Sequence, residues 1–307
     1  MKKILPIFLL ASLMCQSCIK DDLEACSEYI HLHFSYMYGG TNRFFETVSS
    51  PTTIRYYKDG ELYRTHEIGI DEIDLNNPYR FMKTLEDDGE LELAAWTHDD
   101  ALDYVNFDQG TRGEGYVKLK EITEGSGICR PVSDLLYGYL KFDAGDRLTR
   151  TVLTVPFERA VCRMRLTMTP RIQSRSTHTR PDGAADTRAE VPNGGDVTFL
   201  LYGTRSGVNE QHVANNDEVT LQPECQYDEA TGNVVTNWFG TFSSEDKYLK
   251  VEVMNRGEKV AEFDCEPIEL TATPGDFIDL NIDGTYVRPV MEIRVNGWKM
   301  ATIKSIL

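Results

Sequence analysis

Cys18 is the residue whose type and position indicate the most definite chemistry, which is acylation of its thiol. Lys2 and Lys3 open the chain with positive charge, and a mostly apolar run follows them. This run is shorter than the ~20 apolar residues that a membrane-spanning helix needs, so it is typical of a signal peptide. Ser17 is a small residue of the kind that signal peptidases accept. We therefore predict a signal peptide over residues 1–17 and lipidation of Cys18.

Lipidation would hold the mature protein on a membrane by its N-terminus, because two or three acyl chains bind far more firmly than one. The assigned lipidated tether covers residues 18–28, which are rich in charge. Cys15 stands at the third position before Cys18, where a leucine is expected. An ordinary secretory signal with an unmodified mature N-terminus therefore stays open.

The charged residues that directly follow Cys18 indicate where the protein is exported. Lys20, Asp21 and Asp22 resemble the surface-export signal of lipoproteins from a large group of gut and oral Gram-negative bacteria. The resemblance implies a location on the outer face of the outer membrane. The alternative is a solvated tether that happens to be acidic.

No catalytic or metal motif stands out. His31 and His33 lie on one face of a predicted strand, but zinc needs a third ligand and none is suggested nearby. Asp279, Asn281 and Asp283 copy the first half of a calcium loop, yet the bidentate glutamate that should end it is absent. The sequence therefore predicts that the protein is not an enzyme and binds neither a metal ion nor a cofactor.

Charge and cysteine content narrow the class of partner. The net charge is −17, and it becomes −19 once Lys2 and Lys3 leave with the signal peptide. Nucleic acid is excluded as a partner because phosphate binding needs a basic face. The cysteines beyond the lipid site are odd in number and none lies in a metal-binding spacing, so their disulfide pairing stays open. They are Cys26, Cys129, Cys162, Cys225 and Cys265.

Period-two alternation broken by turn residues predicts an all-β chain of two-sheet sandwiches. One alternating stretch ends before residue 150, and a new one covers residues 152–168, in which Cys162 shares the apolar face. We therefore predict an N-terminal β-sandwich domain over residues 29–150 and a C-terminal one over residues 151–307.

Turn residues locate hairpins and one long connection. Asp59-Gly60 lies between two alternating runs, which is a strong hairpin signal because both residue types tolerate positive φ. A similar hairpin is expected around Asn255-Arg256-Gly257. Residues 173–195 are polar and rich in Pro, Gly, Ser, Thr and Arg, so we predict a long mobile excursion there that a trypsin-like protease could cut.

Five short segments, in order over nearly the whole chain, carry a resemblance to a known family. They are Cys18-Ile19-Lys20-Asp21-Asp22-Leu23-Glu24-Ala25-Cys26, Ile30-His31-Leu32-His33-Phe34, Tyr56-Tyr57-Lys58-Asp59-Gly60-Glu61-Leu62, Ser133-Asp134-Leu135-Leu136-Tyr137-Gly138 and Ile293-Arg294-Val295-Asn296-Gly297-Trp298. Together they resemble the fimbrial anchor lipoproteins associated with fimbrillin. The chain departs from the family in having Tyr57 where valine is more usual and in the length of the 173–195 excursion.

The resemblance implies two transthyretin-like β-sandwich domains and a surface lipoprotein that attaches a fimbrial polymer to the outer membrane and limits its length. Its partners would be fimbrial shaft or accessory subunits. The last residues, 291–307, are predicted to be extended, with Met291, Ile293, Val295, Ile303 and Ile306 as apolar positions. We predict that this segment is supplied to the neighbouring subunit by strand addition; a strand of the protein's own second sandwich is the alternative.

A second functional class shares most of these features. A surface glycan-binding lipoprotein of a nutrient-uptake system would have the same lipid signal, β-sandwiches and acidity. Exposed, coplanar aromatic side chains would favour this glycan reader, whereas a terminal strand that packs poorly in its own domain would favour the fimbrial protein.

Overall fold

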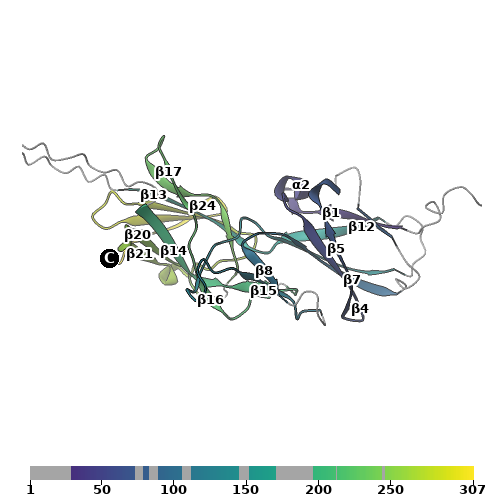
Figure 1. The fold of residues 1–307 in the computed structure, drawn as a ribbon. Coiled ribbons are helices and arrows are strands. Elements are labelled where there is room, and N and C mark those ends of the chain that lie inside the picture. The colour runs from purple at the N-terminus through teal and green to yellow at the C-terminus, as the bar shows by residue number, and fades with distance from the viewer. Residues whose placement is uncertain are drawn as a thin grey trace, which may run out of the picture.

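The computed structural model describes residues 29–72, 79–82, 89–105, 112–144, 152–170, 196–211, 213–243 and 246–307. Its regular structure is almost entirely strand, arranged as two β-sandwiches in a row along the length of the molecule (Figure 1). The predicted all-β class with two tandem sandwiches is confirmed.

The first sandwich is one hydrogen-bonded path of seven strands that folds over on itself at the contact between β11 and β12. These two strands pair over only three residues, and a Cβ added at Gly138 in this contact would lie 2.9 Å from the ring of Phe157. Glycine at 138 therefore allows the close approach. The order is β5 (Glu61–Ile68), β4 (Thr52–Lys58), β7 (Glu90–Thr97), β11 (Leu136–Asp143), β12 (Val152–Arg159), β1 (Tyr29–Ser35) and β6 (Tyr79–Met82).

Alternate side chains of these strands form the core of the first sandwich. Phe34 of β1 and Phe157 of β12 are fully or almost fully buried, and Phe44 from the short helix α2 (Phe44–Thr47) packs on both, with ring centroids 5.5 and 4.7 Å away. The small elements around this core are β2 (Met37–Tyr38), β3 (Thr41–Asn42) and the 3-10 turn η2 (Ile70–Glu72). The buried cluster draws only on residues 30–157.

The position of β12 bears on the predicted domain boundary. The division at residue 150 put β12 in the second domain, whereas β12 runs parallel to β1 inside the first sandwich. The last change from the first sandwich to the second therefore falls between Arg159 and Cys162, about one strand later. The period-two pattern continues through β12 and β13, so it did not indicate that the chain changes sandwich between them.

The second sandwich packs two larger sheets face to face. One has the order β10 (Ile128–Cys129), β16 (Glu218–Leu221), β14 (Val197–Arg205), β20 (Lys250–Asn255) and β21 (Glu258–Asp264). The other has the order β17 (Cys225–Asp228), β18 (Asn233–Thr236), β13 (Cys162–Thr169), β22 (Phe277–Asp283), β23 (Val290–Val295) and β24 (Trp298–Lys304), with β19 (Phe239–Thr241) also on β13. The 3-10 turn η5 (Glu266–Ile268) follows β21.

Strands from the first half of the chain complete the second sandwich. A small sheet joins β8 (Leu102–Val105) and β9 (Tyr116–Leu119) to β15 (Gly207–Asn209), and β10 pairs with β16. The core of the second sandwich accordingly contains Leu102, Val117 and Cys129 together with residues as late as Ile293. The two sandwiches are thus interlocked in sequence, which alternation alone did not predict.

Three hairpins share one design. The turns Asp59-Gly60, Arg256-Gly257 and Asn296-Gly297 all have positive φ at both central residues, as two-residue type I′ turns require. Each returning strand then has one extra residue that opposes nothing on its partner, forming a bulge. The bulge residues are Tyr63, Val260 and Met300. The hairpins predicted at Asp59-Gly60 and Arg256-Gly257 are confirmed, whereas residues 291–307, predicted as one extended segment, fold into a hairpin at Asn296-Gly297.

The cysteines in the described part of the chain are free thiols. They are Cys129, Cys162, Cys225 and Cys265, and Cys26 lies outside the described residues. Cys162 is buried in the core, where burial raises the pKa of its thiol to about 12. It is a packing residue, in agreement with the alternation that placed it on an apolar face.

Candidate functional site

The predicted lipidation and export residues lie outside the described residues. These are Cys18, Lys20, Asp21 and Asp22, together with the 173–195 excursion. Their roles stay predictions. Among the residues that the structure describes, none forms a helix that is both long and apolar enough to span a membrane.

The predicted terminal segment forms the hairpin of β23 and β24. Met291 and Ile293 are fully buried, and Val295 and Ile303 pack against the same core. β23 is hydrogen-bonded to β22 on one side and to β24 on the other, so it is integral to the second sandwich. β24 lies at the edge of the sheet, and of the five predicted positions only Ile306 is largely exposed.

The residues after β24 bridge the two sheets of the second sandwich. Ser305 is buried, and its backbone N–H donates to the carbonyl of Pro289 at 2.8 Å. The Ile306 N–H donates to the carbonyl of Glu262 on β21 at 2.9 Å, and the Glu262 N–H donates to Ser305 Oγ at 3.1 Å. The end of the chain is therefore fastened to the edge of the opposite sheet, while the Ile306 side chain stays in solvent.

The chain enters and leaves the described part of the molecule at opposite ends. β1 runs toward the junction of the sandwiches, because Tyr36 and Tyr38 just after it contact Arg159 and Phe277. Tyr29 therefore lies at the end of the first sandwich that is remote from the junction. The last residue lies at the far end of the second sandwich, where Figure 1 marks it C.

A buried charge cluster fixes the junction between the sandwiches. Arg159, at the end of β12, donates from Nε and Nη2 to both carboxylate oxygens of Asp134 at 2.8 and 2.9 Å. Arg163 of β13 approaches the same carboxylate at 3.7 Å, and burial lowers the pKa of its guanidinium. The Asp134 carboxylate thus pairs with one arginine from β12 and one from β13, the two strands between which the chain passes from the first sandwich to the second.

Aromatic rings complete this junction. Arg159 lies over Phe277 at 4.8 Å and over Tyr36 at 5.3 Å from the ring centroids. Arg165 lies over Trp238 at 4.9 Å and also donates to Asp279 at 2.8 Å. Because Arg159 belongs to the first sandwich and Phe277 to the second, their contact links the two sandwiches, whereas Arg165 and Trp238 pack together within the second.

A buried carboxylate forms a second link between the sandwiches. Glu210 follows β15 and is almost completely buried. Its carboxylate accepts hydrogen bonds from the Tyr57 hydroxyl and from the Gly113 N–H, and its backbone carbonyl accepts one from the Tyr137 hydroxyl at 2.7 Å. Burial raises the pKa of both tyrosines, so both hydroxyls stay protonated and able to donate.

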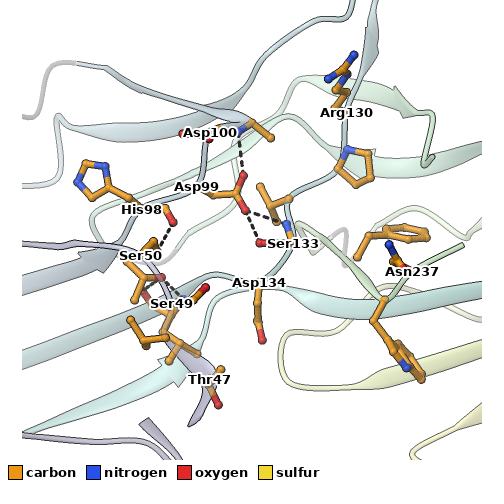
Figure 2. A pocket seen from close by; sticks show the side chains of 18 of the residues that line it. Thr47, Ser49, Ser50, His98, Asp99, Asp100, Arg130, Ser133, Asp134 and Asn237 are labelled. Carbon is orange, nitrogen blue, oxygen red and sulfur yellow. Dashed lines mark hydrogen bonds between the residues drawn. The ribbon is translucent and has the colours of Figure 1, made fainter. Parts of the chain in front are cut away.

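A cavity of about 660 Å³ opens beside this junction (Figure 2). Both sandwiches line it, the first through His98 and Asp99 and the second through Asn237 and Trp238. Apolar side chains at its wall include Pro51, Pro131, Val132, Pro223 and Phe239.

Most of the central polar groups of this cavity are already engaged within the protein. The Ser133 N–H and hydroxyl donate to Asp99 Oδ2 at 2.8 and 2.7 Å, and the Ala101 N–H donates to Oδ1, as the dashed lines in Figure 2 show. His98 Nε2 is hydrogen-bonded to Thr53, and burial lowers the pKa of its imidazole. These side chains shape loops and are not arranged for acid–base chemistry.

The metal motifs weighed in the sequence do not assemble. No group of three or more His, Cys, Asp or Glu side chains in the described part of the chain could hold a metal ion. Asp279, the first residue of the partial calcium loop, is bonded to Arg165. The reading of this segment as a strand followed by a turn is confirmed, because β22 ends at Asp283.

Sequence reasoning missed the junction. Arg163 and Arg165 alternate with Cys162 and Met164, which placed them only on the polar face of a strand. Arginines in the middle of a strand indicate that carboxylates lie opposite, but nothing in the sequence pointed to Asp134. The cavity, formed by loops far apart in the chain, left no sequence signal.

Comparison with known proteins gives a family and a set of similar folds. The model of a family described as fimbrillin-A associated anchor proteins Mfa1 and Mfa2 matches residues 23–304. A search of curated proteins gives no match. The fimbrial anchor protein Mfa2 from Porphyromonas gingivalis is similar in structure, with a TM-score of 0.54, 11% identity, and coverage of 91% of this chain and 100% of that one.

Two further solved structures are similar. A candidate polysaccharide-binding protein from Bacteroides thetaiotaomicron has a TM-score of 0.60 and 16% identity, covering 88% of this chain and 96% of that one. A candidate adhesin from Bacteroides ovatus has a TM-score of 0.60 and 13% identity, covering 90% and 95%. At such low identity these likenesses establish the fold alone.

Proposed function

Because the chain belongs to the family of fimbrillin-A associated anchor proteins, we propose that it holds a fimbria on the cell surface and limits the length of the polymer. The observation that carries this proposal is the family match over residues 23–304, which includes both sandwiches. Its partners are then fimbrial subunits, and it acts by binding, without catalysis.

The position of the chain ends suits an anchor. The predicted lipid at Cys18 would hold the protein by the segment that precedes Tyr29, at one end of the molecule, which leaves the other end free for a subunit. The junction built on Asp134 and Glu210 would transmit tension between them.

Lipidation is tested by replacing Cys18. The variant Cys18→Ala should move from the membrane fraction to the soluble fraction, and mass spectrometry of the native protein should find acyl chains on an N-terminal Cys18. Unchanged membrane partition of the variant would rule out the lipid anchor. Surface exposure is tested separately: Asp21→Ala with Asp22→Ala should leave the lipid in place but protect the protein from protease added to intact cells.

Strand addition is the proposed means of joining the neighbouring subunit. β24 lies at a sheet edge and keeps β23 as its partner, so it can supply its free edge to a strand of the neighbour. Most of its side chains are exposed. This exposure of the edge strand supports the fimbrial reading, while Ile303 and Ser305 still attach the segment to the core.

Deletion of residues 299–307 tests the function as a whole. Cells carrying the truncated protein should shed fimbriae into the medium, and the fibres should be longer than normal in electron micrographs. Circular dichroism must show that the truncated protein is folded, because Ser305 and Ile303 contribute to its core. Fibres that stay attached at normal length would contradict the proposal.

A glycan-binding role is the second candidate, favoured by the junction cavity and by the similar fold of the candidate polysaccharide-binding protein. The aromatic side chains argue against it. Trp96 is buried and Trp238 is covered by arginines, which leaves Trp298 without a coplanar tryptophan among the described residues. Glycan-array binding that is lost in Asn237→Ala, with fimbriae unaffected, would support the second candidate.

A protease-sensitive excursion over residues 173–195, between β13 and β14 of the second sandwich, is also a proposal. Limited trypsin digestion should cut first at Arg175, Arg180 or Arg188, since residues 173–195 have little apolar content to bury. Resistance of this segment, with cleavage inside β12 or β13, would contradict it.

A further inference from the structure

The hairpin of β23 and β24 differs in charge from the two hairpins that share its design. β5 reads ELYRTHEI and β21 reads EKVAEFD, so both returning strands carry acidic residues. β24 reads WKMATIK and has no acidic residue. The same bulged edge strand therefore carries a different surface in each hairpin.

Apolar exposure also distinguishes the β24 edge from the β5 edge. On β5 the bulge residue Tyr63 is half-buried and has the cations of Lys58 and Arg64 within 5.8 and 5.3 Å of its ring. On β24 the Trp298 side chain is 81% exposed and the bulge residue Met300 is 49% exposed. Large apolar side chains left in solvent on a charged protein mark an interaction surface.

Exposed apolar side chains lie at both ends of β24. Trp298 and Met300 stand where the strand begins, and Ile306, Leu307 and Val287 stand beyond its other end, all of them more than half exposed except Met300. The seven residues of β24 that separate the two groups span about 23 Å at ~3.3 Å per residue. Only an extended partner reaches both.

The edge between these groups is available for pairing. Within the described residues, the backbone groups of residues 298–304 form no hydrogen bonds other than those with β23. The edge of β21, in contrast, already accepts the Ile306 N–H at the carbonyl of Glu262.

The local charge is opposite to that of the whole protein. Residues 285–307 contain four basic side chains and one acidic one, a net of +3 in a chain of −17. Arg294 and Lys299 are paired with Glu292, whereas Arg288 and Lys304 have no ion pair with a described residue. Two cations are thus left to attract an acidic partner.

We propose that the β24 edge, with Trp298, Met300 and Lys304, is the docking surface for an extended acidic segment of the neighbouring fimbrial subunit. This inference rests on the proposed anchor function and specifies the chemistry of the partner. The partner strand pairs with the free edge, its apolar side chains pack on Trp298 and Met300, and its carboxylates face Lys304 and Arg288.

The test measures capture of fimbriae, shed by cells that lack this protein, on the immobilised full chain. The matched pair of variants is Met300→Asp and Val260→Asp, because both residues are exposed bulge positions of sister hairpins. Met300→Asp should weaken capture at least about tenfold, because it replaces an apolar contact by a carboxylate that repels the acidic partner. Val260→Asp should leave it unchanged. Thermal unfolding of both variants checks that they are folded.

Charge is tested with Lys304→Glu and with salt. Lys304→Glu should weaken capture about tenfold near 0.15 M salt, and both it and the wild type should weaken as salt rises. Equal capture by wild type, Met300→Asp and Lys304→Glu would overturn the docking surface and leave the anchor function standing. Equal loss in Met300→Asp and Val260→Asp would also overturn it. A wild-type protein that captures no fimbriae would instead contradict the anchor function, and the inference with it.

Discussion

The two sandwiches differ in how their cores draw on the chain. Among the described residues, the first core draws on residues 30–157, whereas the second reaches back to Tyr57 and forward to Ile293. β8, β9 and β10 are responsible, because they leave the first sandwich after β7 and return to it at β11. The comparison teaches that the second sandwich, which carries the proposed docking edge, depends on the first half of the chain for its stability.

The largest expected effect is on a fragment of residues 160–307. It lacks β8, β9 and β10, and with them the buried side chains of Leu102, Val117, Leu119 and Cys129. We expect it to show no cooperative unfolding in urea, because those contacts cannot be replaced. A sharp transition like that of the full chain would contradict this dependence and would show that the C-terminal part folds independently.

A large loss of stability is expected when a buried phenylalanine is removed from either core. Phe157→Ala in the first core and Phe263→Ala in the second should each lower the free energy of unfolding by about 3–5 kcal/mol, the cost of a cavity left by a buried phenylalanine. Urea denaturation followed by circular dichroism measures both. If the cores are coupled through the shared strands, each variant shifts a single transition; a shift confined to one of two transitions would show that they unfold separately.

A somewhat smaller effect is expected at the junction. Asp134→Asn removes the carboxylate that Arg159 and Arg163 share, which leaves buried cations without their counter-ion. Loss of one partner of a buried ion pair costs about 3 kcal/mol or more. The double variant Asp134→Leu with Arg159→Met is the control and should recover part of the stability. No recovery would mean that the unpaired charge of Arg159 is not the source of the lost stability.

The smallest expected effect is acid sensitivity in the second sandwich. Hydrogen bonds from Lys250 and Lys259, both at 2.8 Å, hold the pKa of Glu262 below its ordinary value. A lowered folded-state pKa gives stability that is present above the ordinary glutamate pKa and is lost as pH falls through the folded-state value. The contribution is under about 1 kcal/mol because the lysines are exposed.

This pH effect is measured as the urea midpoint between about pH 6 and about pH 3. Glu262→Gln should reduce the fall in midpoint over the acid range. An identical pH profile for the variant and the wild type would assign the acid sensitivity to other carboxylates.

Local patterns predicted the strands and hairpins well. Period-two alternation found β1, β4, β12 and β13, and the turns at Asp59-Gly60 and Arg256-Gly257 formed as expected, because positive φ at both turn residues is a local requirement. The same alternation could not assign β12 to the first sandwich, since a strand looks alike whichever sheet it joins.

The sequence by itself determined the all-β class, the hairpin turns, the apolar faces and the family resemblance, all of which depend on residue types at short spacing. Tertiary structure alone decided that Asp134 meets Arg159 and Arg163, that Glu210 meets Tyr57, and that β24 ends a sheet with its edge open. These contacts join residues distant in the chain, and the physical reason is that strand order and register are set by packing of whole sheets, which local pattern does not encode.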